Sequence, residues 1–400
     1  MTGGLLGTKG IRQDQSKLSM PYSIDYGAKV PLGFVAEAAP LGADSVKVRL
    51  SGFVSSEDGD KLITYLEGVS EWVLNRLPPE KRPPESQIDH VLLLIPNSGK
   101  ATAYVNELQL TSKVRLKKAV EAGEVVMKDD IADVAEVAFQ GVDIPRDAGV
   151  VIVLSCRWRK AIYFDFTPIA PYDANDRTVD MRVLLAEIYT YLLFQERLNI
   201  SDAQWEEMFR QQWFPFIGLG TDQLRSILTH AEIGAPIDPL LDGFADSSKL
   251  LGERLIETIS ARNDLQEHTQ TLTRALRHFL AGDYLSCTTM LFPRIEGVIR
   301  SWKRAVAPGP ISQKSLATAA ATTGPSGSRH SLSLMLPHKF ETFLDEVYFS
   351  NFDPENVSTV SRNTVSHGVA PESKFNLKSA LLGVLILDQL VRLMLPPSEA

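Results

Sequence analysis

The first half of the chain mixes the hydrophobic patterns of strands and helices. Two apolar runs rich in β-branched and aromatic residues, 150–155 and 161–166, flank a basic segment with a tryptophan, 157–160. Such runs predict a β-hairpin with a basic, aromatic tip. Apolar residues recur at helical spacing over 60–77 and 179–198 and predict two long helices. This part of the chain is therefore expected to have an α+β fold.

The second half shows helical spacing almost throughout. The expected helices cover 247–280 (one or two helices), 284–302, 336–349 and 376–395. The short turn at 282–283 makes its two neighbours an antiparallel αα-hairpin. Residues 376–395 are apolar nearly all round, so this helix must be covered on most sides, at the centre of a bundle or in a subunit interface.

Two stretches lack such periodicity and divide the chain. Residues 218–246 are punctuated by Gly and Pro and are interpreted as an interdomain connector. Residues 305–333 consist largely of Ala, Thr, Gly, Pro and Ser and are expected to form a flexible insertion. The predicted organisation is an α+β domain over 1–217 with an unknown ligand, the connector, and an all-α bundle over 247–400.

The composition of the chain limits the classes of protein to which it can belong. With 400 residues, 44% of them hydrophobic, the chain can form two domains with substantial cores. A net charge of −8 argues against a protein that coats nucleic acid indiscriminately, although a local basic cleft remains compatible with it. No signal-peptide pattern opens the chain, and its longest apolar run, 380–387, is too short to span a bilayer. We therefore expect a soluble, cytoplasmic protein without a membrane partner.

A strand candidate at 90–95 is followed by Pro-Asn-Ser-Gly-Lys, which is reminiscent of a phosphate-binding loop. The motif requires a glycine where Leu94 stands and a Ser or Thr where Ala101 stands. A hairpin turn accounts better for this segment. No nucleotide cofactor is expected from it.

The densest group of chemically competent residues lies at 360–368, in Val-Ser-Arg-Asn-Thr-Val-Ser-His-Gly. Asp353 carries the features of a helix start and Gly368 those of a helix end. On such a helix Asn363 and His367 are four residues apart and share one face. Arg362 lies on the adjoining flank, so a cation, an amide and an imidazole would surround one small volume.

Arg-Asn, three residues, then His-Gly resembles the signature of the HEPN superfamily, whose members are small helical domains and often metal-independent ribonucleases. The resemblance covers about residues 250–400. It implies a helical bundle that dimerises and joins two copies of the motif in a composite active site. It also implies a polar residue on the second helix of the bundle facing the motif, and Glu296 is the position that matches, with Arg300 as its partner four residues on. The alternative for Glu296 and Arg300 is an exposed ion pair.

Metal-free RNA cleavage needs a base for the 2′-hydroxyl proton, positive charge near the phosphorus oxygens and an acid for the leaving oxygen. His367 can serve as base or acid because imidazole titrates near neutrality. Arg362 offers a permanently charged fork for phosphate. Asn363 can hold the imidazole or a phosphate oxygen, and Ser366 is at most a helper. The alternative is that His367 is a structural histidine on the core-facing stripe of its helix.

A local surplus of basic residues lies beside the motif in sequence. Residues 294–330 contain six Arg or Lys but a single acid. This surplus can attract RNA, or it can belong to a merely solvated insertion. The candidate RNA-binding residues are Lys303, Arg304, Lys314 and Arg329.

The other six histidines and the two distant cysteines show no metal-ligand or disulfide spacing, so no metal and no cofactor are expected. The sequence thus predicts a homodimeric endoribonuclease acting on single-stranded RNA, of the toxin or antiphage type, with an antitoxin or sensor as a further partner. One alternative is a non-catalytic HEPN-like module for dimerisation or nucleotide binding. Another is an enzymatic N-terminal domain with the bundle as its scaffold, although no nucleophile–base set in 1–215 supports it.

Overall fold

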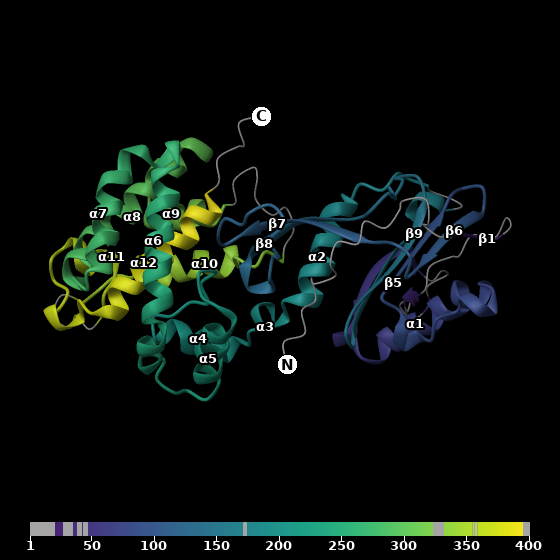
Figure 1. Ribbon diagram of the computed structural model, residues 1–400, viewed down its shortest axis with the longest axis horizontal. Coiled ribbons are helices and arrows are strands. Elements are labelled where there is room, and N and C mark those ends of the chain that lie inside the picture. The colour runs from purple at the N-terminus through teal and green to yellow at the C-terminus, as the bar shows by residue number, and fades with distance from the viewer. Residues whose placement is uncertain are drawn as a thin grey trace. The chain divides into compact units, whose positions relative to one another are not determined.

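A computed structural model of the chain describes residues 21–26, 35–37, 42, 47–170, 174–322, 332–353, 355, 357 and 359–394. The chain divides into two compact units (Figure 1). The first, here called the sheet unit, comprises residues 7–113 and 134–195. The second, the helical unit, comprises residues 1–6, 114–133 and 196–400. The predicted combination of a sheet-containing part and a helix-rich part is confirmed.

The sheet unit is built on a six-stranded antiparallel sheet with the strand order β1-β6-β5-β9-β10-β4. Its strands are β1 (Tyr22–Asp25), β4 (Ser51–Ser55), β5 (His90–Ile95), β6 (Lys100–Val105), β9 (Gly149–Cys156) and β10 (Arg159–Asp165). Short strands β2 (Val35–Glu37) and β3 (Lys47–Arg49) form a separate pair. The central strands are β-branched and apolar on both faces, which is typical of a sheet covered on both sides.

Both predicted hairpins are present. β5 and β6 are joined by a tight turn in which the Gly99 amide donates to the Pro96 carbonyl at 3.0 Å, so the phosphate-loop-like segment is a hairpin turn. β9 and β10 are joined by Arg157 and Trp158 alone, and Arg157 has a left-handed φ of 60°. Trp158 is 71% exposed.

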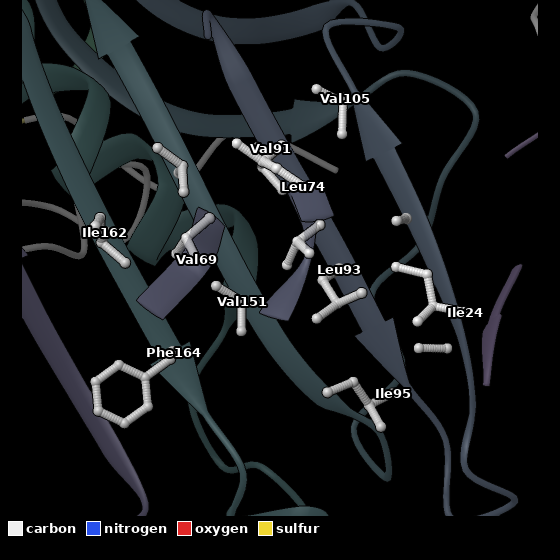
Figure 2. Packing of buried hydrophobic residues seen from close by; sticks show 14 of the residues in the cluster. Ile24, Val69, Leu74, Val91, Leu93, Ile95, Val105, Val151, Ile162 and Phe164 are labelled. Carbon is white, nitrogen blue, oxygen red and sulfur yellow. The ribbon is translucent and has the colours of Figure 1, made fainter. Parts of the chain in front are cut away.

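Two helices pack against the faces of the sheet. Figure 2 shows Val69 of α1 (Asp60–Trp72) in one apolar cluster with Val91, Val151 and Ile162, which point to the same face of neighbouring strands. Residues at the alternate positions, such as Ile152, are also buried, and α2 (Met181–Leu193) contacts β9 and β10. The expected helix at 179–198 ends at Leu193, and α3 (Gln195–Leu198) follows.

The domain boundary differs from the predicted one. β7 (Leu110–Leu116) and β8 (Ile131–Phe139) form a two-stranded ribbon along which the chain enters and leaves the helical unit. Residues 114–133 and 196–217 therefore belong to the helical unit, not to the α+β domain expected over 1–217. The sequence could not reveal this because the ribbon strands carry the same pattern as any half-exposed strand.

Helices are present in the stretches expected at 247–280, 284–302, 336–349 and 376–395, and the expected apolar helix, α12, is buried along nearly its whole length. α12 packs against α8, and α8 packs against α7 and α9. Across the described ranges, no helix combines the length and apolar character needed to cross a membrane. The bounds are α4 (Asp202–Arg210), α5 (Thr221–Glu232), α6 (Ala245–Ser260), α7 (Gln266–Leu280), α8 (Tyr284–Val306), α9 (Gln313–Ala321), α10 (Pro337–Phe343), α11 (Arg362–Ser366) and α12 (Leu377–Leu393), with a π-helical turn at Leu344–Tyr348.

The expected connector at 218–246 is folded. It contains α5 and a 3₁₀ segment, Asp238–Phe244. The glycines that suggested a linker are end signals: Gly220 precedes α5, and Gly234 follows it with a φ of 67°. The aromatic residues just before it pack within the helical unit, where Phe214 and Phe216 contact Phe340 and Phe343.

The expected flexible insertion at 305–333 is also partly folded. Ser312 and Ser315 exchange hydrogen bonds as a capping pair that starts α9. Alanine has the highest helix propensity, and Leu316 and the small side chains of α9 are buried in the helical unit. The Trp302 indole of α8 donates to the Ala319 carbonyl at 3.1 Å. The low-complexity composition therefore led to an incorrect prediction for the residues that form the packed helix α9. Residues 323–331 lie outside the described part.

Candidate functional site

The Arg-Asn-x₃-His-Gly motif occupies the short helix α11. Arg362 is its first residue, and the preceding Ser361 caps it by accepting from the Thr364 amide at 3.2 Å. Gly368 follows the helix with a φ of 68°, as expected of a helix end. The predicted start at Asp353 is wrong: its carboxylate accepts from the Glu355 amide at 3.0 Å in a local turn. An Asx turn and a helix N-cap use the same side chain, which explains the error.

Arg362 is held by Glu296 of α8. The Arg362 Nε atom forms an ion pair with Glu296 Oε2, and Arg300 Nε donates to the other carboxylate oxygen at 2.6 Å. The Glu296 side chain is 4% exposed, whereas those of Arg362 and Arg300 are 24% and 39% exposed. One buried carboxylate thus orients two guanidinium groups that reach solvent. Glu296 and Arg300 are not the exposed pair of the alternative interpretation.

Asn363 is a positioning residue. Its amide nitrogen donates to the carbonyls of Phe349 and Ser350 at 2.9 and 3.1 Å. Its amide oxygen accepts from Gln313 Nε2 at 2.8 Å and from Arg362 Nη1 at 3.0 Å. These four bonds use its whole hydrogen-bonding capacity. The expectation that Asn363 holds the imidazole or a phosphate is therefore wrong, and its structural effect is to fix Arg362.

His367 lies at the C-terminal end of α11 and is exposed. Its ring packs against Phe352, with 5.6 Å between the ring centroids. This exposure contradicts the alternative of a core histidine. The described residues 357, 359 and 360, just before Ser361, are also not helical. Ser366 is exposed as well. The His367 amide donates to the Asn363 carbonyl at 3.0 Å, but among the described residues no side-chain hydrogen bond or ion pair joins His367 to Arg362 or Asn363.

Three further residues support the site and could not be assigned from sequence. Gln313 lies in the segment expected to be flexible, and Phe352 precedes the motif as an ordinary aromatic residue. The Tyr348 hydroxyl is buried and donates to the Phe292 carbonyl at 2.5 Å. Burial, reinforced by the Glu296 charge, raises the Tyr348 pKa well above its usual value, so this hydroxyl stays neutral. The Ser312–Ser315 capping pattern was the one sequence signal that could have indicated the helix carrying Gln313.

The predicted RNA-binding cations have different surroundings. Lys303 is buried, and its ammonium group donates to the Ala307 carbonyl at 3.2 Å, so it caps the end of α8. Arg304 and Lys314 are exposed. Arg329 lies outside the described residues.

The charges around the motif leave a positive surplus at the surface. The Glu296 carboxylate balances only one of the two guanidinium groups that it contacts. Because the carboxylate is buried and the guanidinium groups are partly exposed, an approaching anion meets the cations first. Within the described ranges, no three His, Cys, Asp or Glu side chains are grouped closely enough to hold a metal ion.

No protein-family model, no curated protein and no solved structure matches this chain. The likeness to the HEPN superfamily therefore depends on the sequence motif alone.

Proposed function

We propose that the helical unit is a HEPN-like, metal-independent endoribonuclease that cleaves single-stranded RNA. The observation that carries the proposal is the pairing of Arg362 with buried Glu296 at one end of a helix whose other end presents exposed His367. The carboxylate fixes the guanidinium group in advance, and a fixed cation stabilises developing charge better than a mobile one. The imidazole is open to solvent and hence to substrate.

In the proposed reaction the RNA 2′-oxygen attacks the adjacent phosphorus and the bond to the 5′-oxygen breaks. The products are a 2′,3′-cyclic phosphate and a 5′-hydroxyl end. Arg362 Nε faces Glu296 and Nη1 donates to Asn363, which leaves Nη2, among the described contacts, for a phosphate oxygen. His367 takes the proton of the 2′-hydroxyl or delivers one to the 5′-oxygen.

One histidine in each chain supplies a base or an acid, but the reaction uses both. A two-fold homodimer that brings two copies of α11 together supplies the second imidazole, from the partner subunit's His367. In this arrangement a substrate phosphate lies between two Arg362 guanidinium groups. Because cleavage in this scheme requires the homodimer, an antitoxin or a sensing partner that acts on dimerisation can control it, as expected of toxin or antiphage systems.

The second candidate is a non-catalytic module. The observation that favours it is the ion pair of Glu296 with Arg362, which also joins α8 to α11 and can have a purely structural role. The two functions differ in what removal of His367 does: a structural module does not need its exposed imidazole.

The experiment is RNA cleavage by the full chain in excess EDTA. His367→Ala and Arg362→Ala are each compared with a matched substitution of an exposed residue in the same unit, His338→Ala and Arg274→Ala. We expect wild type and both controls to produce cyclic phosphate ends, and the two motif variants to lose cleavage by at least about a hundredfold. Circular dichroism and solution mass verify folding and dimerisation of every variant.

Two results would contradict the proposal. Equal cleavage by all five proteins would place the activity elsewhere, and a strictly monomeric active enzyme would exclude the composite site. A substrate with a single 2′-deoxy nucleotide at the cleaved position should resist cleavage, since the nucleophile is missing. Cleavage of that substrate at the same bond would overturn the chemistry.

A further inference from the structure

A second site lies in the helical unit, away from the motif. It is a cavity of about 410 Å³ between the inner end of the β7–β8 ribbon, α6 and α12. This volume lies within the range of about 300–1,000 Å³ that is typical of small-molecule sites. Its charged lining residues are Arg115, Lys117, Lys118, Arg262, Arg392 and Asp388.

Five of these lining residues are cations, and three of the five each form an ion pair with a carboxylate. The ion pairs are Lys118 with Asp130, Arg262 with Asp264, and Arg392 with Asp388. Arg392 also donates to the carbonyls of Leu116 and Lys117, and Arg262 donates to those of Val391 and Met394. These contacts give the cavity a rigid, hydrogen-bonded wall.

The remaining two cations lack such a partner. Both terminal nitrogens of Arg115 are buried and donate no hydrogen bond to any described residue. The nearby carboxylate of Asp133 accepts instead from the Ser333 hydroxyl at 2.8 Å and the Leu334 amide at 3.0 Å. Lys117 Nζ donates to the Leu219 carbonyl at 3.3 Å and, within the described part, to no carboxylate.

Burial without a paired anion is electrostatically costly for these two groups. Burial lowers the pKa of Arg115, against the opposing charge of Asp133. It also lowers the pKa of Lys117 to about 8, with Arg197 and Arg392 adding repulsion and Asp129 and Asp388 opposing it. An oxyanion placed between the two side chains would satisfy their hydrogen bonds and remove the repulsion. The cavity is therefore complementary to a negative charge in addition to those that the described carboxylates supply.

We infer that this cavity binds a small molecule carrying a phosphate group, with the phosphate at Arg115 and Lys117. Guanidinium and ammonium donors suit phosphate oxygens, and the guanidinium fork adds direction to the contact. The other walls include Ala132, Met335 and Val391, which can receive an apolar organic body. The cavity shares no residue with the motif site, so this inference stands independently of the ribonuclease.

The test is calorimetric titration of the full chain with inorganic phosphate, phenyl phosphate, adenosine monophosphate and uncharged adenosine. We expect the two phosphate esters to bind and adenosine not to bind. Lys117→Met and Arg115→Met should each weaken binding about tenfold or more, as expected for a lost charged hydrogen bond. Lys249→Met, which removes an exposed lysine of α6, should leave binding unchanged.

Lys117→Arg keeps the charge and should retain binding, which separates loss of the contact from loss of the fold. Melting temperatures check every variant. Absence of binding by all three phosphate compounds would overturn the inference, as would wild-type affinity in both methionine variants. Inorganic phosphate binding as tightly as the esters would support the anion site and exclude a contribution from the apolar wall. The double variant His367→Ala/Arg362→Ala should bind normally, so failure of the ribonuclease proposal would not affect this result.

Discussion

Each unit of this protein holds an arginine against a buried carboxylate, and the two pairs differ in how completely they are enclosed. In the sheet unit, Arg177 donates through Nε to Asp165 at 2.7 Å, and its terminal nitrogens donate to the carbonyls of Pro145 and Ala148. The Arg177 side chain is 1% exposed. In the helical unit, Arg362 contacts Glu296 and Asn363, and its side chain is 24% exposed.

The contrast distinguishes a structural ion pair from one suited to chemistry. The Arg177 group is saturated by acceptors of its own chain, so it has nothing to offer a ligand. The Arg362 group shares its carboxylate with Arg300, retains positive charge and has an exposed histidine on the same helix. Both pairs restrict the guanidinium group, but only the second restricts it where a substrate can reach.

The largest effect is expected from breaking the enclosed pair. Arg177→Met leaves the Asp165 carboxylate buried without its cation, and we expect the free energy of unfolding to fall by about 3–5 kcal/mol. Urea denaturation followed by circular dichroism measures the loss. Arg182→Met, which removes an exposed arginine of the same unit, should change stability by less than about 0.5 kcal/mol. A similar loss in both variants would show that the enclosure of Arg177 is unimportant.

Breaking the open pair should affect chemistry more than stability. In Arg362→Met the Glu296 carboxylate keeps Arg300, so we expect a loss of about 1–2 kcal/mol in unfolding free energy. Cleavage should fall by about a hundred- to a thousandfold, as for removal of one charge-stabilising donor from an active site. Denaturation and initial cleavage rates are measured on the same preparation. If Arg362→Met destabilises the protein as much as Arg177→Met does, both ion pairs are structural and the motif is not a catalytic site.

The sequence predicted the elements whose pattern is local. The hairpin at 150–166, the helix α12 and the helix end at Gly368 follow from alternation, helical spacing and one glycine. The pairing of Glu296 with the motif came from the family resemblance, since nothing in the spacing relates α8 to α11. Asn363 was assigned incorrectly because three of its four side-chain partners lie on other segments, and α9 was missed because its burial depends on contact with α8.

Lys117 extends the comparison to a half-buried cation to which, among the described residues, no carboxylate is bonded. Its pKa of about 8 lies below that of an unfolded lysine, so the unfolded chain binds more protons between about pH 8 and 10.5. The wild type should therefore gain stability relative to Lys117→Met as the pH rises through this window, with a slope of at most about 1.4 kcal/mol per pH unit. Below pH 8 the burial cost is fully present.

Chemical denaturation at pH 7, 8, 9 and 10 measures that difference. Lys249→Met provides the control, because an exposed lysine should give no such trend. A constant difference between wild type and Lys117→Met across the series would mean that Lys117 is solvated and charged throughout.

The smallest effect is expected at Phe352, which contacts the imidazole of the open site. A contact between aromatic rings contributes about 0.5–1.5 kcal/mol, so Phe352→Leu should slow cleavage by roughly two- to tenfold without changing the affinity for RNA. Phe352→Tyr keeps the ring and should restore the rate. Phe53→Leu, at an exposed ring contact of the sheet unit, should have no effect on cleavage. Equal rates for Phe352→Leu and wild type would show that the contact with this ring does not help to position the His367 imidazole.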